Sequence, residues 1–296
     1  MWQYRVLVDD YSSGKSIKEF LINSYLPKRL RGALRQNKGL VVNGQIVATS
    51  YVLKIDDRLT MKFHTDDFYA PDSYRPNYHR AIKVIYENND LMVLDKPAGM
   101  KMHAHSPSED DTLLNYAAAY LKQNQAVSAQ VPARPYMVHR LDRDTSGLVL
   151  IAKNPIVVPI LNRQLSKKEM QRTYYAWVKG HMSATTGIIN RPIGQHPTDD
   201  RLRWVNDDCG QLAQTTWQVV EQLSDRSLLK LALSTGRMHQ IRVHLASVGH
   251  PIIGDSLYGG PQANRLMLQA GQLDLIQPFS RQCLSIKLKN NQLFLE

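Results

Sequence analysis

The sequence has little of what would place the chain in a membrane or an oxidising compartment. It contains 2 cysteines in 296 residues, Cys209 and Cys283, which are far apart and not in a metal-ligand spacing. This argues against a disulfide framework and a structural zinc, and it fits a reducing cytoplasm. The N-terminus shows no basic segment followed by an apolar stretch, and no apolar run approaches the roughly 18 residues of a membrane span. We therefore expect a cytoplasmic chain without a membrane segment.

Positive charge is the feature that the sequence has in excess. Lys and Arg number 37 against 26 Asp and Glu, a formal net charge of +11. The 43% of hydrophobic residues and 21% of charged residues are ordinary for a globular protein. A surplus of this size indicates a polyanionic partner, with RNA or DNA as the leading candidates. On charge alone, a merely soluble basic protein remains an alternative.

Residues 1–62 have the pattern of a compact basic module. The segment 16–25 has apolar residues at helical spacing, and Pro27 can occupy the first turn of a second helix. Asn43 and Gly44 lie between two short apolar segments, which is a strong hairpin signal, and a strand over 58–63 follows. The second helix carries five basic residues and no acid: Lys28, Arg29, Arg31, Arg35 and Lys38. These side chains form either a solvated face or a contact for phosphates.

Two helices followed by a hairpin, with a basic second helix, resemble the small S-four-type RNA-binding domain. The phrase GLVVNGQIV at 39–47 is its most recognisable piece. The resemblance implies that the basic helix binds RNA phosphates and positions the protein without reading sequence. Residues 63–79 are rich in Asp, Pro and Tyr without periodicity and are interpreted as a linker. A larger domain then occupies 80–296.

The segment VHRLDRDTSGLVLIAK, residues 138–153, combines an apolar strand with a polar loop before it. GLVLIA is continuous and apolar, which is typical of a buried strand. A loop on a rigid scaffold is where catalytic groups tend to lie. A turn whose Asp and Thr side chains satisfy backbone groups explains the same residues. The composition of the loop alone leaves both interpretations open.

The string HRLDRDTSGL resembles the signature of the RluA-type family of RNA pseudouridine synthases, H-R-L-D-x-x-T-S-G, at every fixed position. The resemblance implies that Asp142, and not Asp144, is the catalytic aspartate. It also implies that Arg140 fills the space that a flipped base leaves. The segment RTYYAWVKG is similar to the family strand K-x-Y-x-A-x-V-x-G, with Arg172 at the usual lysine. The tyrosine of that strand, which stacks on the target uracil, maps onto Tyr174.

A third segment, residues 233–259, is similar to the family form T-G-R-x-H-Q-I/L-R-x-H and places the family's active-site arginine at Arg242. Apolar residues at helical spacing predict a helix after TGR. His239 and His244 are not at the spacing of a zinc helix, so we interpret both as structural. DKPAG at 95–99 is similar to a fourth family segment, and we expect Lys96 and Pro97 to shape the floor of the cleft.

The resemblance implies an α+β catalytic domain with a mixed, mostly antiparallel central sheet that brings Asp142, Tyr174 and Arg242 into one cleft. The implied reaction converts a uridine of structured RNA into pseudouridine, with base flipping. Nothing is oxidised and nothing leaves, so neither cofactor nor metal is expected, and the sequence has no phosphate-cradling glycine loop or metal-ligand cluster. The resemblance implies that Asp142 acts as a nucleophile or a base, attacking C1′ or C6 or removing a 2′ proton.

Other functions share some of these features. A protein-kinase loop is H-R-D without the inserted Leu141, and no D-F-G follows. A glycosidase requires two carboxylates, for which Asp142 and Asp144 are candidates. A catalytically inactive RNA-binding or ribosome-assembly protein would not need Asp142, Tyr174 and Arg242 together. Family members with an S-four-like domain favour large-subunit ribosomal RNA, with transfer RNA as the alternative substrate, and we expect a monomer.

Overall fold

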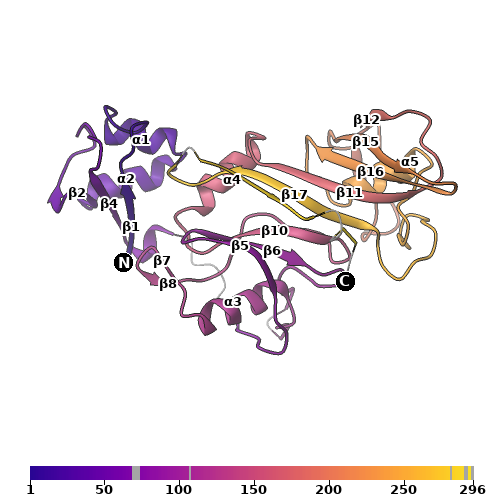
Figure 1. Cartoon of the computed structure of the whole chain (residues 1–296), viewed down its shortest axis with the longest axis horizontal. Helices are drawn as coiled ribbons and strands as arrows, with labels where there is room; N and C mark the ends of the chain where they lie inside the picture. The colour runs from indigo at the N-terminus through magenta and orange to yellow at the C-terminus, as the bar shows by residue number, and fades with distance from the viewer. Residues whose placement is uncertain (69–73, 107, 281, 290–292, 295–296) are drawn as a thin grey trace.

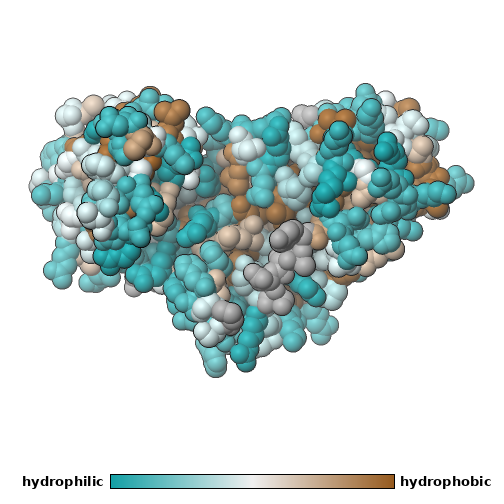
Figure 2. Space-filling model, turned by 180° about the vertical axis from the view of Figure 1, so that it is seen from behind, coloured by the Kyte–Doolittle hydropathy of each residue, from teal (hydrophilic) through white to brown (hydrophobic). Residues whose placement is uncertain are grey.

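The protein has a small module at one end of a larger α+β body (Figure 1). The computed structural model describes residues 1–68, 74–106, 108–280, 282–289 and 293–294. The module has its own four-stranded sheet in the order β1-β4-β2-β3, whereas the body contains one ten-stranded sheet. Both ends of the molecule are mostly hydrophilic in Figure 2, and hydrophobic residues gather in the recess between them. Among the described residues, no helix is long and apolar enough to cross a membrane.

The module contains the helices and the hairpin that the sequence predicts, with one additional strand. Its elements are β1 (Trp2–Leu7), α1 (Ile17–Asn23), α2 (Lys28–Gln36), β2 (Leu40–Val42), β3 (Gln45–Ile46) and β4 (Arg58–Phe63). Ser16 and Glu19 form a capping box at the start of α1. Asn43 and Gly44 both have positive φ, 50° and 87°, as a two-residue hairpin turn requires. Strand β1, which we did not predict, pairs with β4 along its whole length.

The sheet of the body is mixed and mostly antiparallel, which confirms the predicted fold class. Its main path is β12-β15-β16-β11-β17-β10-β6-β5, with β18 beside β17 and β9 beside β10. The pairing of β10 with β17 is parallel, and the other pairings in this sheet are antiparallel. Its strands are β5 (Lys83–Glu87), β6 (Leu91–Lys96), β9 (Tyr136–Met137), β10 (Ser146–Ala152), β11 (Gln171–Lys179), β12 (Thr186–Asn190), β15 (Gln214–Gln222), β16 (Arg226–Leu233), β17 (Leu268–Ile276) and β18 (Cys283–Lys287). The remaining elements are η1 (Thr65–Asp67), α3 (Leu113–Gln123), α4 (Val158–Ser166), α5 (Gln240–Ser247) and two short hairpins, β7 (Val127–Ser128) with β8 (Val131–Pro132) and β13 (Ile193–Gln195) with β14 (Arg203–Val205).

Strand β10 is buried on both faces, which explains its continuous apolar sequence. Leu148 and Leu150 belong to the hydrophobic cluster that includes α4. Val149 and Ile151 belong to a second cluster that includes residues of α3 and α5. Because successive side chains of a strand point to opposite faces, helices on both sides of the sheet fix β10 and the polar loop before it.

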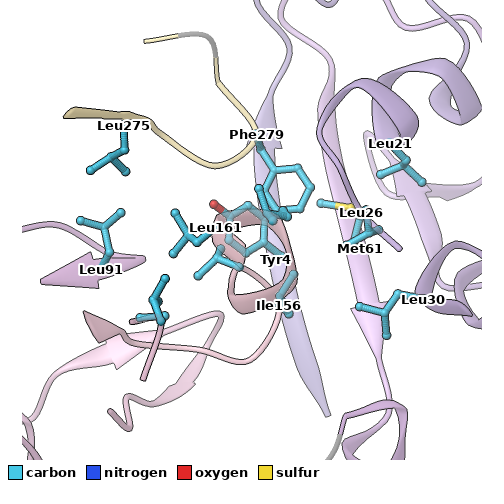
Figure 3. Packing of buried hydrophobic residues seen from close by; sticks show 14 of the residues in the cluster. Tyr4, Leu21, Leu26, Leu30, Met61, Leu91, Ile156, Leu161, Leu275 and Phe279 are labelled. Carbon is cyan, nitrogen blue, oxygen red and sulfur yellow. The ribbon is translucent and has the colours of Figure 1, made fainter. Parts of the chain in front are cut away.

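The module and the body share one hydrophobic cluster (Figure 3). The Tyr4 and Phe279 rings lie between the two parts, with their centroids 4.6 Å apart. The Phe20 ring of α1 lies 6.2 Å from the Phe279 ring. Module residues Leu21, Leu26, Leu30 and Met61 belong to the same cluster as body residues Leu91, Ile156, Leu161 and Leu275. The module therefore has no core separate from that of the body.

Polar contacts reinforce this junction. The Tyr4 hydroxyl donates to Asp90 Oδ2 at 2.5 Å, and the Tyr25 hydroxyl donates to Glu169 Oε1 at 2.7 Å. Burial, followed by the charge of Asp90, raises the pKa of Tyr4 well above its usual value, so the phenol keeps its proton. In the segment interpreted as a linker, residue 63 completes β4, residues 74–79 are described, and residues 69–73 lie outside the described residues. The described part of the chain thus fixes the module on the body.

We predict that Phe279→Ala destabilises the protein by about 3–5 kcal/mol, the usual cost of deleting a buried aromatic side chain. Phe279 contacts both Tyr4 and Phe20. Its loss should therefore weaken the junction between the module and the body more than the interior of either part. Urea unfolding measures the effect, with Val220→Ala, an exposed side chain of β15, as the control. Equal stability of the two variants would contradict a shared core.

His139 anchors the start of the polar loop to β10. Its Nε2 accepts the backbone N–H of Leu150 at 3.1 Å, and the ring is buried. Burial, with a smaller effect from Arg172, lowers the pKa of His139 to about 3. The ring is therefore neutral at physiological pH, with its proton on Nδ1, because Nε2 is an acceptor.

This histidine makes stability depend on pH. Its pKa of about 3 in the folded protein lies below the roughly 6.5 of an unfolded histidine, so the unfolded chain binds the proton first. Stability is lost as the pH falls from about 6.5 towards 3, by up to about 1.4 kcal/mol per pH unit. We predict that His139→Gln has a correspondingly flatter acid limb in urea unfolding from pH 6.5 to 4.5. Parallel curves for the two proteins would show that His139 does not titrate in this way.

Candidate active site

One cavity of about 230 Å³ collects the three motif segments. The loop before β10 contributes Arg140 and Asp142 to its lining, and β11 contributes Tyr174. The turn before α5 contributes His239, and the helix itself contributes Arg242. Segments that are 30 to 100 positions apart in the sequence thus meet as the motif resemblance implies.

The loop that carries Asp142 is held from two sides. Lys96 Nζ donates to the carbonyls of Arg143 at 2.7 Å, Met100 at 2.8 Å and Pro97 at 2.9 Å. Burial lowers the pKa of Lys96 to about 7. The three carbonyls nevertheless require three N–H donors, which only the ammonium form provides, so Lys96 is charged in this structure. On the other side, Gly147 has φ 105°, and a Cβ there would lie 2.2 Å from the Ala270 carbonyl of β17. The glycine of the motif therefore permits the close approach of β10 and β17.

Arg242 is buried and has two carboxylate partners. Its Nε and Nη2 donate to Asp255 Oδ2 and Oδ1 at 2.8 and 2.7 Å. Its Nη1 lies 3.9 Å from Asp142 Oδ2. Burial opposes the charge of Arg242, but the hydrogen bonds and charge of Asp255, with the charge of Asp142, raise its pKa. The guanidinium is therefore fixed by Asp255 and presents its remaining nitrogen to Asp142.

Tyr174 lines the cavity from the central strand β11. It belongs to the same buried cluster as Ala176 and Val178, the face that the alternation of β11 predicts. The pairing of β11 with β17 shifts register between Thr173 and Tyr174. Such bulges redirect side chains and are frequent beside active sites. Burial raises the pKa of Tyr174, so a neutral aromatic ring faces the cavity.

The cavity joins one carboxylate to several arginines. Among the described residues that line it, Asp142 is the sole acid, and its side chain is 27% exposed. Arg140 and Arg237 are exposed at the lining. Asp144 lies outside this set and pairs with Arg143 at 3.0 Å. A two-carboxylate glycosidase site is therefore not formed, and the cavity suits an anionic substrate.

His239 has a different position from the one that we expected. We interpreted it as structural, but it lines the cavity, and its Nε2 lies 3.8 Å from Asp142 Oδ2. His244 is buried, in contact with Thr215 Oγ1 and the Arg191 carbonyl, as a structural residue would be. We singled out neither Asp255 nor Tyr258. Asp255 could have been predicted from the sequence. A buried arginine needs an acidic partner, and the segment GDSLYG after the helix offers an aspartate.

The five basic residues predicted on the second helix lie away from this cavity, four of them in α2 and Lys38 just after it. None of them is among the residues that line it. Leu30 and Leu34 form the buried face of α2, and the basic side chains lie on its other faces. Arg31 is half-buried and donates its Nε to the Leu26 carbonyl at 3.1 Å. The exposed members are Lys28, Arg29, Arg35 and Lys38.

No group of three or more His, Cys, Asp or Glu side chains within the described ranges could hold a metal ion.

Comparison with solved structures identifies the fold. The human RNA Pseudouridylate Synthase Domain Containing 1 matches with a TM-score of 0.61 and 23% identity, over 73% of this chain and 86% of that one. The human RNA Pseudouridylate Synthase Domain Containing 4 matches with a TM-score of 0.56 and 21% identity, over 70% and 88% of the two chains. The body is therefore similar in fold to pseudouridylate synthase domains.

Sequence comparison identifies the family. The uncharacterized RNA pseudouridine synthase YhcT of Bacillus subtilis is 34% identical over 88% of this chain and 90% of its own length. The ribosomal large subunit pseudouridine synthase D of Salmonella typhimurium is 33% identical over 93% of this chain and 77% of its own length. The protein of that name from Nitrosomonas europaea is 38% identical over 69% of this chain and 60% of its own length. The family model described as RNA pseudouridylate synthase matches residues 90–247, more than half of the chain, with Asp142, Tyr174 and Arg242 inside the match. The chain thus belongs to the RNA pseudouridylate synthase family, whose members convert uridine of RNA into pseudouridine, and it is an enzyme of that kind.

Proposed function

We propose that Asp142 is the catalytic carboxylate of this isomerase, with Tyr174, Arg242 and Arg140 as its partners. One observation carries the proposal: Asp142 is the sole acid among the described residues that line the cavity, and Arg242 lies 3.9 Å from it. Two unit charges near 4 Å attract by roughly 4 kcal/mol at an effective dielectric of 20, before desolvation is subtracted. Arg242 thereby places a fixed positive charge beside the carboxylate that would react with the uridine.

The reaction breaks the C1′–N1 bond and forms a bond between C1′ and C5 of the same uracil. The C5 proton is then lost and N1 gains a proton, so no atom is added to the RNA. Asp142 starts this sequence by attack on C1′ or C6 or by removal of a 2′ proton, each of which uses an ionised carboxylate. After the uracil turns, the base must stay close to the sugar, and the walls of a small cavity serve that purpose.

Tyr174 and Arg140 suit the flipping of the target base. Extrusion of a nucleotide costs a few kcal/mol. Stacking on an aromatic ring contributes about 1–3 kcal/mol, which offsets much of that cost. Tyr174 provides the ring in the buried part of the cavity, and the exposed Arg140 guanidinium can fill the space that the base leaves in the RNA.

We propose large-subunit ribosomal RNA as the substrate and residues 1–62 as an S-four-like RNA-binding domain. The names of relatives such as the Salmonella protein support the choice of RNA. The exposed basic side chains of α2 support the role of the module. We further propose that the chain acts as a cytoplasmic monomer. Mapping pseudouridines in ribosomal and transfer RNA from cells that lack the protein tests the substrate, and a loss confined to transfer RNA would overturn this choice.

We predict that Asp142→Asn abolishes pseudouridine formation and leaves RNA affinity nearly unchanged, because affinity comes mainly from phosphate contacts. Asp144→Asn is the matched control, since Asp144 pairs with Arg143 outside the cavity, and it should retain most activity. Tritium release from RNA labelled at uridine C5 measures turnover, and filter binding measures affinity. An active Asp142→Asn protein would remove Asp142 from the chemistry. A wild-type protein that binds RNA without releasing tritium would indicate an assembly factor.

We predict that neutralising the exposed basic face of α2 weakens RNA binding without slowing the chemical step. The variant changes the three exposed basic residues of α2, Lys28, Arg29 and Arg35, to alanine. It also changes Lys38, which follows the helix with φ 50°, to asparagine, which tolerates that backbone. If each contacts one phosphate, the slope of log K against log salt flattens by about 3 units. Arg31 stays, because its Nε is bonded to the Leu26 carbonyl. Point substitution is preferable to deletion of the module, because deletion would expose the shared core.

The control for this experiment removes four exposed basic residues of the body: Lys122, Arg163, Lys179 and Lys230. Single-turnover rates at saturating RNA should be equal in both variants and the wild type. A salt slope that changes equally in the two variants would assign no special role to α2.

A further inference from the structure

Two groups approach the same oxygen of the Asp142 carboxylate. Arg242 Nη1 lies 3.9 Å and His239 Nε2 lies 3.8 Å from Oδ2. For both groups the closest approach is to Oδ2, and among the described residues no hydrogen bond is made to Oδ1. We infer that His239 and Tyr258 form a positioning pair, which holds Asp142 by Oδ2 so that Oδ1 is the oxygen that reacts with the uridine. The inference rests on the catalytic role proposed for Asp142.

The backbone of His239 is in a conformation that residues other than glycine rarely adopt. Its φ is 56° and its ψ is 19°, in the left-handed region, immediately before α5. Such residues persist where the surroundings fix them, and they cluster at functional sites. Gln240 fixes the turn, since its Oε1 accepts from the Arg237 N–H at 3.0 Å and the Thr235 hydroxyl at 2.8 Å. The turn therefore holds the His239 ring against the cavity at the expense of local strain.

Tyr258 determines which nitrogen of His239 carries the proton. The Tyr258 hydroxyl accepts the Arg203 N–H at 2.9 Å and lies 2.8 Å from His239 Nδ1. A phenol has one hydrogen to donate, and among the described residues no other acceptor is bonded to it, so we assign this hydrogen to Nδ1. Nδ1 is then an acceptor, so the proton of a neutral His239 is on Nε2, the nitrogen that faces Asp142.

The burial of the His239 ring favours this neutral form. Burial lowers its pKa most, Asp142 and Asp255 oppose that shift, and Arg242 and Arg203 add to it. A neutral ring can donate Nε2–H to the carboxylate without adding a second positive charge beside Arg242. The separation of 3.8 Å is longer than a hydrogen bond, and such contacts often shorten when the substrate binds.

Tyr258→Phe tests the pair, because it deletes the hydroxyl and keeps the ring that lies 5.1 Å from the Arg242 guanidinium. Nitrogen-15 NMR of the full-length protein reports the tautomer of His239. We expect Nε2–H in the wild type and a gain of the Nδ1–H form in the variant. The single-turnover rate at saturating RNA should fall by about tenfold or more, the usual effect of losing an orienting partner. The half-saturating RNA concentration should change by less than about twofold, because phosphate contacts dominate binding.

Tyr120→Phe is the matched control. Tyr120 lies in α3, is not among the residues that line the cavity, and donates its hydroxyl to Glu87 at 2.9 Å. The variant should keep the wild-type rate and tautomer. A Tyr258→Phe protein with an unchanged tautomer and a rate within about twofold of the wild type would overturn the inference, given that an outer partner normally costs more.

A second variant, His239→Asn, should also lower the single-turnover rate by about tenfold or more, and a rate within about twofold of the wild type would overturn the inference whatever the stability of Tyr258→Phe. His239→Asn removes the ring, and asparagine tolerates the left-handed backbone. If the two residues act as one unit, His239→Asn with Tyr258→Phe is no slower than His239→Asn alone. Additive losses would overturn the pair. The Asp142→Asn protein separates this inference from the proposed function. If that protein is inactive, the proposed function stands whatever the His239 and Tyr258 variants show, whereas an active Asp142→Asn protein would overturn the proposed function itself.

Discussion

The buried ion pair between Arg242 and Asp255 is the interaction on which the geometry of the site depends. Both side chains are almost fully enclosed, and each would be costly to bury without the other. Asp255 takes two of the guanidinium nitrogens, so the third has a fixed direction towards Asp142. The backbone N–H groups of Leu257 and Tyr258 also donate to Asp255. One carboxylate thus orients α5, the turn that follows it and the tyrosine beside His239.

Under the proposed function, the positive lining of the cavity has two consequences. Exposed arginines such as Arg140 would attract the RNA backbone, and the buried Arg242 would pair with the Asp142 carboxylate. The two effects respond differently to salt. Screening weakens contacts of exposed groups such as Arg140, whereas the buried Arg242 is screened much less. Loss of binding at high ionic strength therefore need not be accompanied by loss of the chemical step.

Sequence reasoning succeeded where local pattern determines structure. The continuous apolar run of β10, the helical spacing of α5 and the Asn43–Gly44 turn each result from interactions within a few residues. The motif resemblance placed Asp142, Tyr174 and Arg242 together, and the described cavity contains all three. Their roles in the reaction stay predictions.

Contacts between distant parts of the chain were not predictable in this way. Tyr4 and Asp90 are 86 positions apart, and no periodicity relates them. The full pairing of β1 with β4 depends on the fold of the whole module, because β1 has no partner near it in the sequence. The position of His239 at the cavity was not predicted for a similar reason. Its spacing excluded zinc, but only the left-handed turn before α5 directs the ring to Asp142.

The parallel pairing of β10 with β17 has a consequence for the synthesis of the protein. It joins Ser146 and Gly147 to Gln269 and Ala270, and it supports the loop of Asp142 from behind. A nascent chain leaves the ribosome from its N-terminus and cannot make this pair until β17 is added, more than 120 residues after the start of β10. The basic helix α2 of the module is translated long before that. During translation the chain therefore acquires this helix before the strand that supports the loop of Asp142.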